Sequence, residues 1–520
     1  MSQIVQAGQL NATALVVPDV YVQILAPNVA TLNGVPTNVL GYVGVASWGP
    51  VNAPITIGSA GDVLSKLGPI TNRSNDLATA CSVAIQQGAN NMRAVRVSDG
   101  TDTPATLVMK DTSETPEAGV TLTARYTGVL GNLIQVALTS GSAASTYRLT
   151  LQMPGASPEV YDNIAGTGEI LWQNIAAAVN LGNSAVRGPS QFVTAAVGTS
   201  TSTPATTVVT GSGGTDGSAA ITTAKLIGVD GSLGTRTGMY ALRGTGTSVA
   251  AVVDCFDVAS WTSQAAFGLS EGIYMITAGA AGQTPADAVD AKATAGIDSY
   301  AIKVLLGDWC VWADNANGVQ RLLSPATFYA GLLANTAPQN SGLNRQVFGI
   351  IATQSSLNSQ VYSSTDLQQM VQGGIDVITN PCPGGTYFGP RIGHNASSNP
   401  AIQGDNYTRM TNYLASTLAA GMGRFIGQNQ STDKSDPTRA GAKATIDSFL
   451  VAMIGTGPSD RQIDSFSTIL DLTNNSPARI GQGYMQCDVT ARYLSVVEKF
   501  IINLSGGQTV DVQRVSTQSQ

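Results

Sequence analysis

Short apolar runs alternate with segments of helical periodicity along most of the chain, and this rhythm predicts an α/β fold. In the first hundred residues, strands are expected at 20–25, 37–46, 55–57 and 92–97. A helix is expected to begin near Ser59, because Ser59 can cap it and Asp62 falls in its first turn. Residues 75–87 are apolar at helical spacing and predict a second helix, which stops at Gly88.

The same rhythm returns after residue 217. Helices are expected at 219–227, 261–269, 285–295, 365–372, 405–420 and 437–454, and strands at 249–256, 273–278, 300–305, 375–379 and 386–392. The stretch 486–504 is rich in strand-forming residues, and 509–515 alternates as a last strand.

Between these two parts the pattern changes to short alternating runs separated by Gly, Ser and Pro, which is typical of an antiparallel β-module. One helix is expected there, at 168–181, and the Ser/Thr/Gly-rich stretch 198–217 is interpreted as a loop or linker. We therefore predict a multidomain fold of mixed α/β and α+β character. Its parts are an N-terminal arm (1–17), the first part of a core (18–98), an inserted β-rich domain (99–212), the main α/β core (213–504) and a C-terminal arm strand (505–520).

The composition fits a large protein that covers much of its surface with neighbours. Only 11% of the 520 residues are charged while 43% are hydrophobic, so the low charge does not indicate disorder. The formal net charge of -7 argues against nucleic-acid binding, which normally requires a basic surface.

Metal and cofactor chemistry have little support in the residues. His394 is the only histidine, and the five cysteines include no CxxC pair. We expect no metal, no cofactor, no disulfide framework and folding in a reducing compartment. The start of the chain lacks a basic, then apolar, leader pattern, and prolines and asparagines interrupt the uncharged stretch 20–61, so we expect no targeting or membrane segment.

The sequence contains partial matches to two catalytic motifs. A P-loop is excluded because the chain has no Gly-Lys dipeptide. The glycine-rich stretches 211–217 and 244–248 do not complete the dinucleotide-binding motif GxGxxG. A formal GxSxG centres on Ser270, with Asp308 or Asp376 and then His394 downstream, which allows an α/β hydrolase as an alternative of another class. However, Ser270 is expected to end a helix before a strand, the reverse of a nucleophile elbow, and His394 is expected in a surface loop. We therefore predict no catalytic residues and no enzyme.

The charged clusters of the sequence can be explained by their positions on the expected helices. The pairs Asp287/Asp290 and Asp433/Asp436 lie near expected helix starts, where carboxylates stabilise the helix dipole. The basic stretch Lys434, Arg439 and Lys443 is either a solvated helix face or a contact for an acidic protein partner.

The order of several motifs resembles one known family, the contractile tail sheath proteins of phages and related injection machines. The motifs are VPDVYVQI (17–24), with Asp19 where the family has glycine, VLGYVGVASWGPVNAPITIGSAGDVLSKLG (39–68), AIQQGANNMRAVRV (84–97), YTGVLGN (126–132), the stretch 159–161, GSGGTDG (211–217), GGIDVI (373–378), FGPRIG (388–393) and the two long helices near the end. Each motif is loose, but their order and spacing are specific and span most of the chain.

The resemblance implies a structural protein whose core domains stack as hexameric rings in a helical sheath around a tail tube, with the inserted domain facing outward. The implied partners are other copies of the chain, the tail tube protein, and baseplate and tail terminator proteins, without direct nucleic-acid contact or membrane insertion. The implied location is the virion tail, assembled in the host cytoplasm. The sheath of a headless injection particle is the alternative within this class.

In this family, arms at both termini add strands to sheets of neighbouring subunits. The termini of this chain have few helix signals, and Gly506 and Gly507 supply a hinge before the last strand. The residues expected in inter-subunit strands are Ile4, Val5, Leu10, Val510, Val512 and Val515. The resemblance also makes Lys434, Arg439 and Lys443 candidates for contact with the tube. Without a nucleotide site, contraction would draw on energy stored in a metastable extended lattice.

Overall fold

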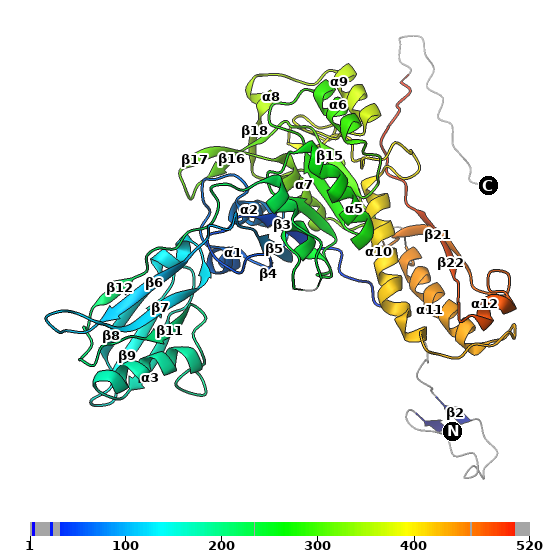
Figure 1. Cartoon of the computed structure of the whole chain (residues 1–520). Helices are drawn as coiled ribbons and strands as arrows, with labels where there is room; N and C mark the ends of the chain where they lie inside the picture. Colours follow the sequence, from blue (N-terminus) through cyan, green and yellow to red (C-terminus); the bar gives the residue numbers. More distant parts are fainter. Residues whose placement is uncertain (1–2, 6–20, 24–31, 233, 458–459, 505–520) are drawn as a thin grey trace.

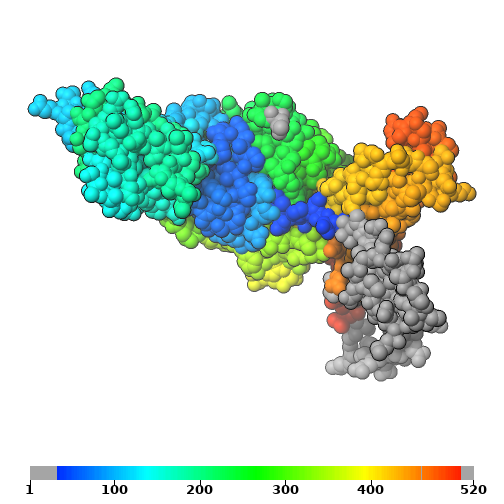
Figure 2. Space-filling view, turned by 90° about the horizontal axis from the view of Figure 1, so that it is seen from below, coloured from blue at the N-terminus to red at the C-terminus, as the bar shows by residue number. Residues whose placement is uncertain are grey.

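The computed structural model describes residues 3–5, 21–23, 32–232, 234–457 and 460–504. Its body consists of a central α/β core, an inserted β-rich domain at one end and a C-terminal unit at the other (Figure 1). The space-filling view shows the same order, with the inserted domain and the C-terminal unit on opposite sides of the core (Figure 2). The fold is therefore mixed α and β and multidomain, as the sequence predicts.

A six-stranded sheet forms the centre of the core. Its strand order is β15 (Ile302–Leu305), β14 (Tyr274–Ala278), β13 (Val249–Val252), β3 (Leu40–Gly44), β5 (Met92–Arg96) and β4 (Pro54–Ile57). All neighbours are parallel except β4, which runs antiparallel along the edge of the sheet. The residues of the first five strands are almost all buried, as expected of a sheet covered on both faces.

Helices cover both faces of this sheet. One face packs against α1 (Ala60–Leu67), α2 (Leu77–Gln86) and α7 (Pro325–Ala334). The other packs against α4 (Thr223–Ile227), α5 (Trp261–Glu271), α6 (Pro285–Ala295) and α9 (Ser364–Gly373). Within β3, Tyr42 points into the first layer and Val43 into the second, which follows from the two-residue period of a strand.

Side-chain caps explain why several helices begin where the sequence predicts. Ser59 accepts a hydrogen bond from the Asp62 amide at the start of α1. Thr284 and Asp287 form a reciprocal capping box at the start of α6. The predicted helix at 219–227 is shorter than expected, because Thr222 caps α4 and the helix begins only after it.

A second, antiparallel sheet on the core was not predicted. It contains β17 (Val319–Leu323), β16 (Cys310–Asp314) and β18 (Ile350–Thr353), and α8 (Gln354–Leu357) follows it. The strand predicted at 386–392 is reduced to β20 (Gly389–Pro390), which pairs with β19 (Ile378–Thr379). Proline cannot donate to a sheet ladder, so a longer strand is disfavoured there.

The inserted domain has its own hydrophobic core between two antiparallel sheets and one helix. The sheets have the orders β10-β9-β8-β12 and β11-β7-β6. Their elements are β6 (Pro104–Lys110), β7 (Ala118–Thr127), β8 (Gln135–Ser140), β9 (Tyr147–Gln152), β10 (Glu159–Ile164), α3 (Gly168–Leu181), β11 (Val193–Val197) and β12 (Val208–Thr210). The interpretation of 198–217 as a plain linker was wrong, because β12 lies within it and pairs with β8.

Asp216 fixes the inserted domain to the core. Its carboxylate accepts hydrogen bonds from the guanidinium of Arg73, from Ser47 Oγ (3.1 Å) and from the Val129 amide (2.6 Å). Beneath it, the buried Arg96 guanidinium donates to main-chain carbonyls on both sides of the joint, including that of Asp216 at 3.3 Å. The GSGGTDG motif is therefore a braced joint and not a flexible turn.

The C-terminal unit is built from α10 (Asp405–Met422), α11 (Pro437–Ile454), β21 (Ile463–Ile469), α12 (Pro477–Gly481) and β22 (Asp488–Tyr493). It has a separate apolar core that includes Met410, Leu450 and Ile463. Leu32, which precedes β3 in the chain, packs into the same core and so ties the beginning of the described body to its end.

We predict that Asp216→Ala loosens the joint, because it leaves the Arg73 guanidinium and the Val129 amide without their shared acceptor. Arg73 keeps its ion pair with Asp76 at 2.9 Å, so the expected cost is that of the lost hydrogen bonds, about 1–3 kcal/mol. Small-angle scattering should show a broader distribution of interatomic distances, and proteinase K, which needs no lysine or arginine, should cut residues 98–103 or 211–217 faster. Asp290→Ala, at an exposed position, should change neither measurement. An unchanged scattering curve for Asp216→Ala would refute the brace.

Candidate assembly surfaces

The N-terminal strands form a small sheet with open edges. β1 (Gln3–Val5) pairs in parallel with β2 (Tyr21–Gln23), so that Ile4 lies opposite Val22. Within the described ranges this sheet has only these two strands. Isolated two-stranded sheets are marginally stable in water, so this one is a natural site for a further strand. The expected arm residues Ile4 and Val5 lie in β1, whereas Leu10, Gly506, Gly507, Val510, Val512 and Val515 lie outside the described residues.

The C-terminal unit presents a second sheet of this kind. β21 and β22 pair antiparallel, and no third strand joins them in the part of the chain that the structure describes. One face is held by α11 through Ile463 and Phe466, so the sheet is anchored while its edges stay open. Exposed main-chain donors and acceptors on such an edge favour pairing with another chain.

An exposed apolar segment follows β22. Residues 494–504 form no regular strand, although the sequence predicted a strand-rich stretch to 504. The segment leaves the C-terminal unit and runs beside the core (Figure 1). Val497, Phe500, Ile501, Ile502 and Leu504 are each between 74% and 91% exposed. Because so dense a group of large apolar side chains is unusual on a free surface, it marks an interaction site.

The three basic residues proposed for tube contact have different surroundings. Lys434 is exposed. Lys443 pairs with Asp447 at 2.8 Å on the surface of α11. Arg439 is only 2% exposed, and its guanidinium donates to the carbonyls of Ser431 (2.7 Å) and Asp433. Its charge is therefore used within the subunit to hold the loop before α11.

A buried lysine joins the core sheet to the C-terminal unit. Lys303, on β15, is fully buried, and its ammonium lies 2.6 Å from Asp376 Oδ2 and 3.1 Å from Asp405 Oδ1. It also donates to the carbonyl of His394 at 2.8 Å. Since Asp405 begins α10, this ammonium connects the end strand of the core sheet to the helix that carries the C-terminal unit.

Two tyrosines complete this cluster. The Tyr274 hydroxyl donates to Asp405 Oδ1 at 2.5 Å, and the Tyr329 hydroxyl donates to Asp405 Oδ2. Burial alone would raise the pKa of Asp405, but the Lys303 ammonium and the two hydroxyls outweigh it and hold that pKa below its usual value. The carboxylate is therefore ionised in the folded protein, and every polar atom at its end has a partner.

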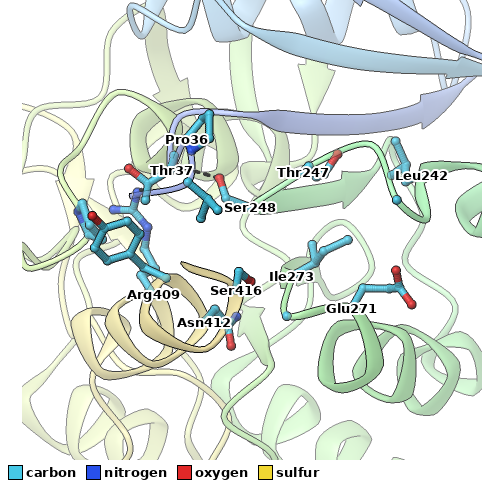
Figure 3. A pocket seen from close by; sticks show the side chains of 16 residues that line it. Pro36, Thr37, Leu242, Thr247, Ser248, Glu271, Ile273, Arg409, Asn412 and Ser416 are labelled. Carbon is cyan, nitrogen blue, oxygen red and sulfur yellow. Dashed lines mark hydrogen bonds between the residues drawn. The ribbon is translucent and has the colours of Figure 1, made fainter. Parts of the chain in front are cut away.

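A cavity of about 300 Å³ lies where the core, α10 and the incoming N-terminal segment meet (Figure 3). Thr37 lies in the wall of the cavity. Its main-chain carbonyl accepts hydrogen bonds from Ser248 Oγ at 2.7 Å and from the Arg409 guanidinium at 3.4 Å. Burial lowers the pKa of Arg409 to about 10. The lining contains neither histidine nor cysteine.

The hydrolase motif is not assembled. Ser270 lies in the last turn of α5 and donates to the carbonyl of Phe267, as the predicted helix-to-strand order requires. His394 contacts Glu498 at 2.8 Å, while Asp376 is bound to Lys303. Asp308 accepts hydrogen bonds from the Ser355 amide and the Tyr362 hydroxyl. The prediction of His394 on the surface was wrong: its side chain is only 8% exposed, because the C-terminal segment covers it.

The other expected ligand position of an α/β sheet is filled by protein. Such sheets bind ligands beyond the carboxyl ends of the strands, where the strand order reverses, which is here between β3 and β13. The Asn75 side chain donates to the Val253 carbonyl at 2.6 Å, and its amide donates to Asp254 Oδ2 at 3.1 Å. This loop occupies the crevice. Among the described residues, no group of three metal-ligating side chains is found and no helix is long and apolar enough to span a membrane.

Comparison with known proteins shows which solved structures share the fold of this chain. No protein-family model matches the sequence, and no curated protein matches it. The sheath tail protein of Listeria innocua matches at a TM-score of 0.57 and 15% identity over 89% of this chain and 96% of that one. The sheath tail protein of Desulfitobacterium hafniense matches at 0.53 and 15% identity over 92% and 100%.

A third solved structure is an assembled one, the helical sheath of the anti-feeding prophage in its contracted state. It matches at a TM-score of 0.53 and 11% identity over 94% of this chain and 99% of that one. The chain therefore has the fold of contractile tail sheath proteins over nearly its whole length. The resemblance inferred from the motifs is confirmed at the level of fold.

We predict that Lys303→Met lowers the free energy of unfolding by about 3–5 kcal/mol at pH 8, because it leaves two carboxylates buried without their cation. In the wild type, the ionised Asp405 stabilises the fold above its unfolded pKa, near 4, and this contribution is lost as the pH falls through its lower folded value. In the variant, the pKa of Asp405 should rise above its unfolded value, so the deficit should shrink as the pH falls from 8 to 5. Urea unfolding at both pH values measures this change.

Lys225→Met removes an exposed lysine and is the matched control, expected to stay within about 0.5 kcal/mol of the wild type. A deficit in Lys303→Met that is small, or equal at pH 8 and pH 5, would contradict the proposed role of the ammonium.

Proposed function

We propose that this chain is the structural subunit of a contractile tail sheath, which polymerises as stacked hexameric rings around a tail tube and contracts to drive the tube through an envelope. The observation that carries the proposal is the likeness of fold over 89% to 94% of the chain to two sheath tail proteins and to a helical sheath. The open strand edges and the exposed apolar segment support it independently, because each needs a partner chain.

The connections between subunits are made by strand addition. Each open edge, on β1–β2 or on β21–β22, offers main-chain groups to a strand from another copy. A main-chain hydrogen bond contributes only about 0.5–1.5 kcal/mol net, so one contact is weak. Repeated over many copies, these contacts form a mesh in which subunits can turn while staying linked. The arm residues and the Gly506–Gly507 hinge have this role in the proposal.

Contraction uses energy stored during assembly. The sequence has no nucleotide-binding motif, so the extended lattice is metastable on the tube and shortens when the baseplate releases it. Purified subunits without a tube should therefore assemble directly into the contracted form. The tail tube, the baseplate and the tail terminator are the proposed partners.

A phage tail and a headless injection particle use the same chemistry, and the solved structures of similar fold include both a prophage-derived sheath and sheath tail proteins. The genes beside the coding sequence distinguish them, since capsid genes indicate a phage. The Ser270 hydrolase has no supporting feature in the described structure.

We predict that the wild type forms rings or tubes in negative-stain images and that Phe500→Asp/Ile502→Asp does not. Both side chains are solvent-exposed in the subunit, at 82% and 74%, so the thermal midpoint should stay unchanged while assembly is lost. Val186→Asp is the matched control, because Val186 is 95% exposed on the inserted domain, which faces outward in the proposal. Discrete small particles from the wild type, or normal tubes from the double variant, would count against the proposal.

We also predict that Lys434→Glu/Lys443→Glu weakens co-sedimentation of the sheath with tail tubes at least tenfold, while assembly of the sheath alone is unchanged. Both side chains reach the surface of the C-terminal unit. Unchanged co-sedimentation would place the tube contact elsewhere.

A further inference from the structure

The C-terminal segment is held against its own subunit at a few points. The Tyr493 hydroxyl lies 3.0 Å from Thr411 Oγ1, and Asn406 Nδ2 donates to the Leu494 carbonyl at 3.0 Å. In a third contact, His394 Nε2 lies 2.8 Å from Glu498 Oε1. The exposed apolar residues from Phe500 onward follow directly after this contact. Glu498 therefore stands at the boundary between the part of the segment that is bound to the body and the part that is free to reach another subunit.

The histidine of this contact is held in a fixed position. Asp376 accepts hydrogen bonds from the Ile392 amide at 2.9 Å and the Gly393 amide at 2.8 Å, just before His394. The Lys303 ammonium binds the His394 carbonyl. The loop thus cannot follow the segment if the segment moves away, so the strength of the contact depends on the side-chain pair alone.

Glu498 is the charged side chain that contacts the imidazole. The other charged groups of this region reach the His394 main chain or each other. Lys303 on β15 binds the His394 carbonyl and pairs with Asp376 after α9 and Asp405 at the start of α10, and Arg409 on α10 interacts with Asp405. Histidine is the side chain that changes charge between about pH 5 and 8. As an imidazolium it makes a charge-assisted bond to Glu498, and as a neutral ring it makes only an ordinary hydrogen bond.

We propose that His394 and Glu498 form a pH-dependent tether, which holds the C-terminal segment on its own subunit at low pH and releases it for exchange with a neighbouring copy as the pH rises. The tether rests on the proposed function, because it regulates the same segment that is proposed to join subunits. Its consequence is that arm exchange, and with it the onset of polymerisation, is faster at pH 8 than at pH 6.

The Lys499–Phe500 bond provides a direct test, because trypsin cuts after lysine and this bond adjoins the tether. The full chain is digested at pH 6 and pH 8, at a concentration at which negative stain shows no particles. The rate at this bond is measured by mass spectrometry and divided by the rate for a synthetic peptide of residues 494–504 in the same buffer. We expect the normalised rate of the wild type to be about two- to fivefold higher at pH 8, the range of a partly exposed ion pair.

Glu498→Gln keeps a hydrogen-bonding group but removes the charge, and His394→Gln removes the titrating ring. Both variants should give the same normalised rate at the two pH values. Glu498→Gln alters a half-exposed side chain, so it tests the tether even if His394→Gln folds poorly. Glu114→Gln removes an equal charge from an exposed position of the inserted domain and should keep the wild-type dependence.

A wild-type rate that does not change with pH, or a change that persists in Glu498→Gln, would overturn the tether. Since the digestion uses unassembled protein, this failure would leave the sheath proposal intact. Conversely, a chain that never forms tubes but shows the pH-dependent cleavage would keep the tether and reject the sheath.

Discussion

One buried ammonium determines how the core of this molecule is joined to its C-terminal unit. Lys303 lies on β15, the strand at one end of the six-stranded sheet, and its partners Asp376 and Asp405 come from a loop distant in sequence and from the first turn of α10. A charge of this kind is tolerated in a protein interior only when every partner is in place, so the cluster fixes one position of α10 relative to the sheet. The C-terminal unit, the path of the final segment and the His394 contact all follow from that position.

Rigid joints inside the subunit are combined with open edges outside it. Asp216 braces the inserted domain, and Lys303 braces the C-terminal unit, so force applied at one end is carried through the body. Among the described residues, the two-stranded sheets β1–β2 and β21–β22 lie outside the core and have no third strand. This division suits a protein whose subunits rearrange as bodies and whose connections are made by strands exchanged between copies.

Features governed by neighbours in sequence could be predicted, and features governed by distant contacts could not. The helix at 285–295 was predicted to the residue because its Thr284 cap and Asp287 are local signals. The strand β12 was missed within a Ser/Thr/Gly-rich stretch, since only its pairing with the distant β8 makes it a strand. His394 was placed on the surface because Glu498, which covers it, is far away in sequence. Arg439 was a candidate for a solvated helix face or a partner contact, although its guanidinium binds its own loop.

The central claim is that the open sheets of one copy are completed by strands of another. A density map of the assembled particle, at a resolution that traces the main chain, tests this most directly. The account predicts that terminal segments from neighbouring copies lie hydrogen-bonded along the β21–β22 or β1–β2 edges. A map in which both ends of each chain fold back onto their own subunit, with no strand shared between copies, would contradict it.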